Sequence, residues 1–183
     1  MEPWPTMPPD LPSPATAPYR ISTDGQEIFR PFMWEIRSIS ACLEELAKFR
    51  ANVLGITGPQ WMILMAVDYL GKEKGVSVNL VSRLMHVDPS FVTTHSKVLE
   101  KKGLLRRKPS TADARVVQMS LTAKTRKHLA SLTPREEAQD VQGFDEFGPD
   151  GSSEFITGLA AVRHRLEKAR SGIQKTKTSN RQK

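Results

Sequence analysis

The sequence predicts a mainly α-helical fold that carries a small β wing, and three observations support this prediction. Apolar residues recur at helical spacing along most of residues 32–99. Gly103 follows Lys101 and Lys102, as is typical of a residue that ends a helix. Beyond it, residues 116–121 alternate in the way a half-buried strand does.

Residues 78–121 are predicted to form a short helix, a turn, a second helix and a hairpin. Leu80, Leu84 and Val87 are spaced to form the buried face of the short helix. Asp88 suits an N-cap and Pro89 suits the first helical position, so the second helix is expected to start there and to reach about Lys102.

The second helix is expected to bury Phe91 or Val92 together with Ser96 and Leu99. Strands are expected at residues 104–108 and 116–121, with a small polar loop at 109–115 and with Val117, Met119 and Leu121 facing inward. Two helices joined by a tight turn and followed by a basic hairpin form a winged helix-turn-helix core.

The chemistry of this core suits DNA. A helix with small hydroxyls and a lysine can reach base edges and phosphates in a major groove. An arginine at the wing tip, Arg115, suits the negative potential of a narrow minor groove. Arg106, Arg107 and Lys108 are expected to contact the DNA backbone and to set affinity rather than sequence preference. The major-groove candidates share one polar face, which an ordinary solvent-exposed helix would also show: Ser90, Thr93, Thr94 and Lys97.

Residues 57–125 resemble the MarR family of bacterial transcription regulators. The resemblance rests on ITGPQWMILMAV at 56–67, DPSFVTTHSKVLEKKGLLRR at 88–107, and the Asp-x-Arg wing of Asp113 and Arg115 followed by a strand and Leu121-Thr122. It implies an obligate homodimer whose terminal helices interlock. Asp113 is expected to orient an arginine, because DNA phosphates would repel its carboxylate.

The composition is that of one ordinary domain, with no apolar run long enough for a membrane span and no secretory signal. A single cysteine excludes an internal disulfide and allows a reducing cytoplasm. The net charge of +7 is uneven, at +8 over residues 97–127, −7 over 136–154 and +6 over 168–183. A localised positive field is what phosphate neutralisation requires, although a basic run is often merely solvated.

The flanking segments are predicted to include dimerisation helices. Seven prolines make residues 1–20 an arm without regular structure. Within the dimerisation segment at 21–56, a helix is expected to begin between Gln26 and Pro31 and to reach about Val53. It carries a heptad stripe that suits packing along another helix, as does a second stripe near the C-terminus, although each could instead bury against its own chain. The stripes consist of Phe32, Ile36, Ile39, Leu43 and Leu46, and of Phe155, Leu159, Val162 and Leu166.

Further elements are expected around the core. Thr57 caps a helix that buries Trp61, Leu64, Met65 and Leu70, and residues 76–78 add a short strand beside the wing. Thr122 caps a helix that reaches about Leu132, where Thr133-Pro134 interrupts or restarts it. Residues 126–169 are expected to form C-terminal dimerisation helices with a loop at 143–153, and residues 170–183 a disordered basic tail.

The resemblance also implies an effector pocket for a small aromatic carboxylate or phenol. Flat apolar walls and one cation are available, although Met and Trp on helices are more often plain core. The candidates are Met33, Trp34, Arg37, Trp61, Met62 and Met65.

Other chemistry is less favoured. Cys42 could sense redox state, as in the peroxide-sensing branch of the family, but it lies mid-helix with only Lys48 as a nearby cation, which favours an unreactive thiol. His86, His95, His128 and His164 show no metal-ligand spacing, and no enzyme motif or cofactor signature occurs.

The sequence thus predicts a cytoplasmic homodimeric DNA-binding regulator, a repressor that a small aromatic effector releases. A winged-helix protein-interaction module without DNA binding and a redox-responsive regulator are the alternatives.

Overall fold

The computed structural model describes residues 25–71, 75–131 and 148–180, with side chains omitted at 25–28, 149 and 171–180. The chain forms two compact units, residues 1–120 and 121–183. The first unit contains the helix-turn-helix and most of a three-stranded antiparallel sheet, which confirms the predicted fold class. The predicted proline-rich arm at 1–20 lies outside the described residues.

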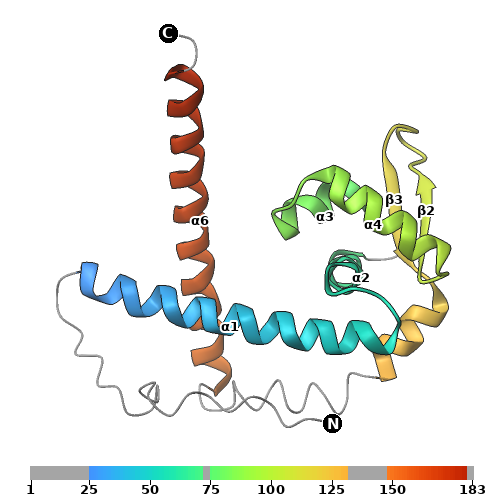
Figure 1. Cartoon of the computed structure of the whole chain (residues 1–183), viewed down its shortest axis with the longest axis horizontal. Helices are drawn as coiled ribbons and strands as arrows, with labels where there is room; N and C mark the ends of the chain where they lie inside the picture. The colour runs from blue at the N-terminus through green and yellow to red at the C-terminus, as the bar shows by residue number, and fades with distance from the viewer. Residues whose placement is uncertain (1–24, 72–74, 132–147, 181–183) are drawn as a thin grey trace. The chain divides into compact units, whose positions relative to one another are not determined.

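Helix α1 (Gly25–Val53) begins one residue before the predicted range of starts, Gln26 to Pro31, and ends at the predicted Val53. Its end is a Schellman motif, in which Gly55 takes a left-handed φ of 62° and the Ile56 amide donates to the Ala51 carbonyl over 3.0 Å. Only its last turns are well buried, at Ala47 and Ala51. The other half of α1 extends away from α2 (Figure 1).

Helix α2 (Gly58–Leu70) starts with the predicted cap, strengthened into a capping box. The Thr57 amide donates to Gln60 Oε1 over 3.1 Å, and the Gln60 amide donates to Thr57 Oγ1 over 3.4 Å. Trp61 and Leu64 are buried as predicted, whereas Met65 and Leu70 are half-buried. Helix α2 therefore forms the centre of the first unit.

Helix α3 (Val78–Met85) buries a different face from the predicted one. Leu80 and Leu84 are 44% and 43% exposed, and Val87 is only half-buried. Val81 is fully buried instead. The short helix has a second apolar stripe that includes Val81, and packing on the rest of the unit selects that stripe.

Helix α4 (Pro89–Lys101) follows the prediction closely. Val92, Ser96 and Leu99 are buried. Gly103 has a left-handed φ of 70°, and the Leu104 amide donates to the Leu99 carbonyl over 3.0 Å, which is again a Schellman motif. The turn after α4 therefore directs the chain straight into the wing.

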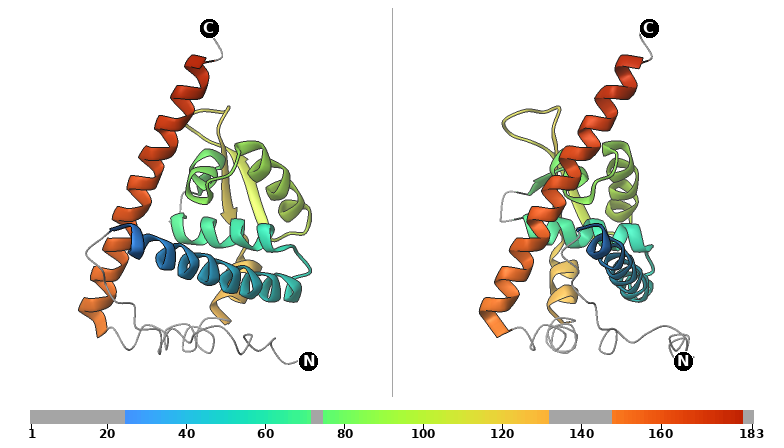
Figure 2. Two further views of the ribbon diagram at one scale, coloured as in Figure 1. Left: turned by 60° about the vertical axis from the view of Figure 1, so that its left-hand side comes forward. Right: turned by 90° about the vertical axis from the view of Figure 1, so that its left-hand side faces the viewer.

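The sheet consists of β1 (Val76–Ser77), β2 (Leu105–Pro109) and β3 (Val117–Leu121) in the order β1-β3-β2. β1 pairs with β3 in the register Val76 to Met119, which confirms the predicted third strand. Met119 and Leu121 are buried as predicted, and Val117 is half-buried. Strand β2 forms one edge of the sheet beside α4 (Figures 1 and 2).

In the second unit, a helical segment covers residues 123–131, and Thr122 caps it as predicted, with its Oγ1 accepting from the Thr125 amide over 3.2 Å. Helix α6 (Gly148–Asn180) differs from the prediction at both ends. It includes residues 148–153, which were expected to be a loop, and its backbone is helical through most of the 170–183 tail, which was expected to be disordered. Gly148 and Asp150 fit a helix start, the latter because its charge complements the helix dipole.

No single helix among the described residues is long and apolar enough to cross a membrane. Residues 29–53 and α2 pass that criterion only as a pair, and the two are bent by 93° at the break between them.

Candidate nucleic-acid interface

The start of α4 is fixed by Asp88. Its Oδ1 accepts from the Ser90 amide over 2.8 Å in an N-cap arrangement. Hydrogen bonds from the Ser90 side chain and backbone stabilise the ionised form, so the pKa of Asp88 lies below its usual value. The cap thus holds the first turn of α4, where Ser90 is exposed, in a defined geometry.

The predicted polar face of α4 is present. Ser90, Thr94 and Lys97 are exposed, and Thr93 is half-buried at its margin. This face lies opposite the buried side of the helix, so its hydroxyl and ammonium groups are available to a partner. That these four residues bind DNA stays a prediction.

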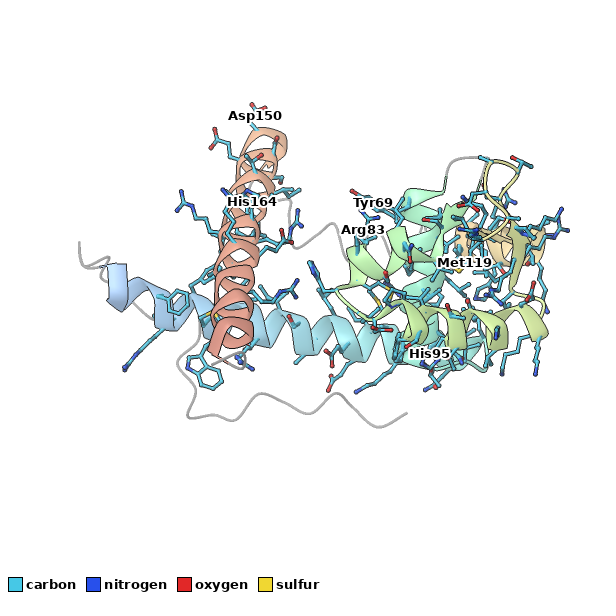
Figure 3. The ribbon with its side chains drawn as sticks, turned by 90° about the horizontal axis from the view of Figure 1, so that it is seen from above. Tyr69, Arg83, His95, Met119, Asp150 and His164 are labelled. Atoms are coloured by element: carbon cyan, nitrogen blue, oxygen red, sulfur yellow. The ribbon has the colours of Figure 1, made fainter. Side chains whose placement is uncertain are left out.

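A ring contact not anticipated from the sequence lies beside this face. The rings of Phe91 and His95 have centroids 4.3 Å apart at an interplanar angle of 58°. Their i, i+4 spacing on a predicted helix was the available signal. The contact fixes His95, which Figure 3 labels on α4, next to Thr94 in the sequence.

The wing tip is closed by short hydrogen bonds. Asp113 Oδ1 accepts from the Arg115 amide over 2.9 Å, and the Asp113 carbonyl accepts from the Val116 amide over 2.9 Å. Below the tip, the Ser110 amide donates to the Val116 carbonyl over 2.7 Å. Asp113 therefore shapes the backbone that carries Arg115, and the Arg115 side chain is exposed at the tip.

The three basic residues of β2 do not share one environment. Arg106 and Lys108 are exposed, as a phosphate contact requires. The Arg107 side chain is only 12% exposed, and its Nη1 lies 3.9 Å from Glu100 Oε2. Arg106 and Lys108 are therefore accessible to a phosphate and Arg107 is largely buried, while the DNA contacts of all three stay predictions.

A second contact holds the far end of α4. Lys102 Nζ donates to the Gly55 carbonyl over 2.6 Å, which links the end of α4 to the turn between α1 and α2. Lys97, Arg106, Lys108 and Arg115 are exposed on α4 and the wing, and exposed cations also occur on α1 and α3, among them Arg37 and Arg83. The cations on α4 and the wing can attract a polyanion.

The candidate effector residues are not brought together within one chain. Trp34 lies nineteen residues before the end of α1, roughly 28 Å along the helix axis, and it is 70% exposed. Trp61 lies in the first turn of α2 and is 3% exposed. The α2 members Met62 and Met65 are therefore distant from the α1 members Met33, Trp34 and Arg37.

Cys42 is an exposed free thiol on α1. No group of three or more His, Cys, Asp or Glu side chains suited to a metal ion occurs among the residues that the structure describes.

Residues 54–116 match the family model described as the MarR family. A curated relative is the HTH-type transcriptional repressor MdtR of Bacillus subtilis (strain 168), which is 37% identical over 68 residues. That match covers 37% of this chain and 42% of the relative, so the chain spans less than half of the relative's length.

Solved structures extend the likeness to about three quarters of the chain. A MarR/EmrR family regulator from Acinetobacter sp. ADP1 is similar with a TM-score of 0.62 at 19% identity, covering 77% of this chain and 98% of the other. BldR from Sulfolobus solfataricus gives 0.61 at 22% identity, with 78% and 99% covered. MepR of S. aureus, solved in a complex with DNA, gives 0.60 at 18% identity, with 74% and 97% covered. Together these findings confirm the resemblance to the MarR family and the winged-helix fold.

Proposed function

We propose that this chain, whose residues 54–116 match the MarR family, is a sequence-specific DNA-binding transcriptional repressor. One observation carries the proposal: the exposed polar face of a firmly capped α4 and an exposed Arg115 at a closed wing tip occur on one compact unit. MepR, which shares the fold, was solved with DNA, and MdtR is described as a repressor.

The recognition chemistry follows from the side chains. Hydroxyls of Ser90, Thr93 and Thr94 can donate to or accept from base edges in a major groove, and Lys97 can reach a base or a phosphate. Arg115 carries the one guanidinium at the wing tip and suits a narrow minor groove. Arg106 and Lys108 would contact phosphates and add affinity independent of sequence.

The active form in this proposal is a homodimer. Both apolar stripes have members that are exposed to solvent in the single chain. Ile39 and Leu43 of the α1 stripe are 48% and 60% exposed, and Leu166 of the α6 stripe is 49% exposed. Apolar stripes of this length are usually covered in the functional state. A two-fold dimer would bind a pseudo-palindromic operator with half-sites about 10 bp apart.

We place the effector, a small aromatic carboxylate or phenol, where two chains meet. The α1 and α2 candidates are separated within one chain, so a second chain is needed to bring the two sets together. An effector that binds one arrangement of the dimer better than the other would release DNA by shifting that equilibrium.

The test is a fluorescence-anisotropy titration against DNA from the region upstream of the protein's own gene, with a scrambled duplex as control. We expect tighter binding to the native duplex, with affinity that falls steeply as salt rises. Sequence-specific binding would be contradicted by two results together. The native and scrambled duplexes would be bound with equal affinity, and selection from a pool of random sequences would yield no duplex that is bound more tightly.

The effector is tested in the same assay. Benzoate and phenol analogues should release the operator and change the emission of Trp34 or Trp61 in a Trp4→Phe background. If no aromatic acid or phenol does either, the effector proposal is wrong while the DNA-binding proposal stands.

A further inference from the structure

Glu100 and Arg107 join the recognition helix to the wing at two points. Glu100 Oε1 accepts from the Arg107 amide over 3.0 Å, and Glu100 Oε2 lies 3.9 Å from Arg107 Nη1. Glu100 stands in the last turn of α4, and Arg107 is the middle residue of β2. The same carboxylate thus contacts both the backbone and the side chain of one wing residue.

The strand pattern explains why Arg107 turns inward. Successive side chains of a strand point to opposite faces, so Arg107 shares a face with the buried Leu105. The neighbours Arg106 and Lys108 point to the other face and are exposed. β2 is an edge strand, so no neighbouring strand lies on its outer side. The Glu100 carboxylate therefore accepts a hydrogen bond from an Arg107 amide that no strand would pair with.

We propose that Glu100 and Arg107 are positioning residues that fix the wing relative to α4. This inference rests on the proposed function, because both elements must enter adjacent grooves of one DNA duplex at the same time. The chain connection between α4 and β2 is the short turn at residues 102–104. The Glu100 carboxylate supplies a second attachment several residues along the wing, and this attachment restricts rotation of the hairpin that carries Arg115.

Electrostatics gives the pair a further effect. A carboxylate close to a DNA-binding surface repels phosphates, and the Arg107 guanidinium offsets the Glu100 charge. Arg107 itself is 12% exposed, so it is not presented to solvent as Arg106 and Lys108 are. Loss of Glu100 would leave a largely buried cation without this partner, which disfavours the present wing position.

The test separates positioning from phosphate contact by salt dependence. Arg107→Gln and Glu100→Ala are compared with Lys108→Gln, the exposed neighbour on the same strand. We expect both pair variants to lower the ratio of operator affinity to random-DNA affinity tenfold or more, with little change in the slope of log K against log salt. Lys108→Gln should weaken both DNAs and reduce the slope by about 0.9 for each phosphate that the protein no longer neutralises, hence about twice that for a dimer.

Two more variants exclude simple misfolding. Glu100→Gln keeps an oxygen that can accept from the Arg107 amide, so it should lose less operator affinity than Glu100→Ala. The exchanged pair, Glu100→Arg with Arg107→Glu, should recover part of the operator preference that either single exchange loses. Far-UV circular dichroism of every variant should match that of the parent protein.

A salt slope for Arg107→Gln that falls as for Lys108→Gln would overturn the proposal and make Arg107 a phosphate contact. So would an unchanged operator-to-random ratio in Glu100→Ala. If the parent protein binds operator DNA and random DNA equally, the proposed function is wrong. The hydrogen-exchange rate of the Arg107 amide then tests separately whether Glu100 attaches the wing to α4. Faster exchange in Glu100→Ala would support the attachment, and an unchanged rate would overturn it.

Discussion

Arg115 is the residue on which the proposed minor-groove contact depends. Its amide donates to Asp113 Oδ1, and its side chain is exposed at the tip of the wing. Substitution Arg115→Ala should weaken operator binding by about 1–3 kcal/mol, the usual loss when one base-edge contact is removed. Anisotropy titration measures the change, with Arg165→Ala, an exposed α6 arginine, as the charge-matched control. Equal losses in the two variants would show that only net charge matters.

Asp88 gives a prediction about pH. Its hydrogen bonds with Ser90 hold its pKa below the ordinary value of 3.8, so the folded protein favours the ionised form. The stabilisation is therefore present above the unfolded-state pKa and is lost as pH falls through the lower folded-state value. Asp88→Ala should lower the melting temperature at pH 7, whereas Asp88→Asn, which can still cap, should lower it less.

Thermal unfolding from pH 7 to pH 3 checks this prediction. The difference in melting temperature between the parent protein and Asp88→Asn should shrink as pH falls below about 3.8, because the parent loses its charge and the variant has none to lose. A difference that stays constant over this range would show that the charge of Asp88 adds nothing to the cap.

The end of α4 is set by backbone conformation rather than by side-chain space. Gly103 has a φ of 70°, and a Cβ placed there would meet nothing within 4 Å. Gly103→Ala should still destabilise the protein by about 1–2 kcal/mol, because an L-residue is disfavoured in the left-handed region. Gly103→Asn should be milder, since Asn tolerates that region. Urea unfolding followed by the buried Trp61 measures both.

Gly158→Ala, the same substitution inside a helix, should have the opposite effect on stability from Gly103→Ala. Gly158 lies inside α6 with open space around it, and no left-handed φ constrains it. Gly158→Ala should be neutral or stabilise α6 by about 0.5–1 kcal/mol, because Ala loses less freedom in a helix than Gly does. Destabilisation of similar size in both Gly→Ala variants would contradict the conformational argument at Gly103.

At the level of elements, the sequence predicted what local chemistry decides. The caps at Thr57 and Asp88, the stop at Gly103 and the inward face of α4 all depend on neighbours within a few residues. The face of α3 could not be predicted in this way, since its eight residues carry two apolar stripes. Contacts with the rest of the unit bury Val81 and leave Leu80 and Leu84 at the surface.

In the candidate site, too, features set by local sequence were predicted and features set by tertiary contacts were not. The polar face of α4 and the exposed wing tip were predicted, because helix periodicity and the turn define them. Arg107 was grouped with Arg106 and Lys108 as one basic run, although strand alternation already separated it from them. Its pairing with Glu100 depends on how the wing folds back on α4, and no local pattern contains that information. The separation of Trp34 from Trp61, by contrast, follows from the nineteen residues of helix between Trp34 and the end of α1, which the sequence already contained.

For the whole molecule, the apolar stripe of α1 supports the proposed homodimer. Ile39 is 48% exposed and Leu43 60% exposed on a helix of 29 residues. Exposed apolar surface of this extent marks an interaction site more often than a solvated face. Two half-sites of an operator can be bound together only if two winged helices are held at a fixed spacing.

Leu43→Glu tests this assembly directly. Since Leu43 is exposed in the single chain, a glutamate there leaves the fold of one chain nearly unaffected, whereas it buries an unpaired charge in any helix-to-helix interface. We expect a monomer by sedimentation velocity, with unchanged circular dichroism and operator affinity lowered at least a hundredfold. Leu84→Glu on α3, which replaces a leucine that is 43% exposed, should remain dimeric. A Leu43→Glu protein that stays dimeric would place the interface elsewhere, because a buried glutamate pair on facing helices would be too unfavourable to persist.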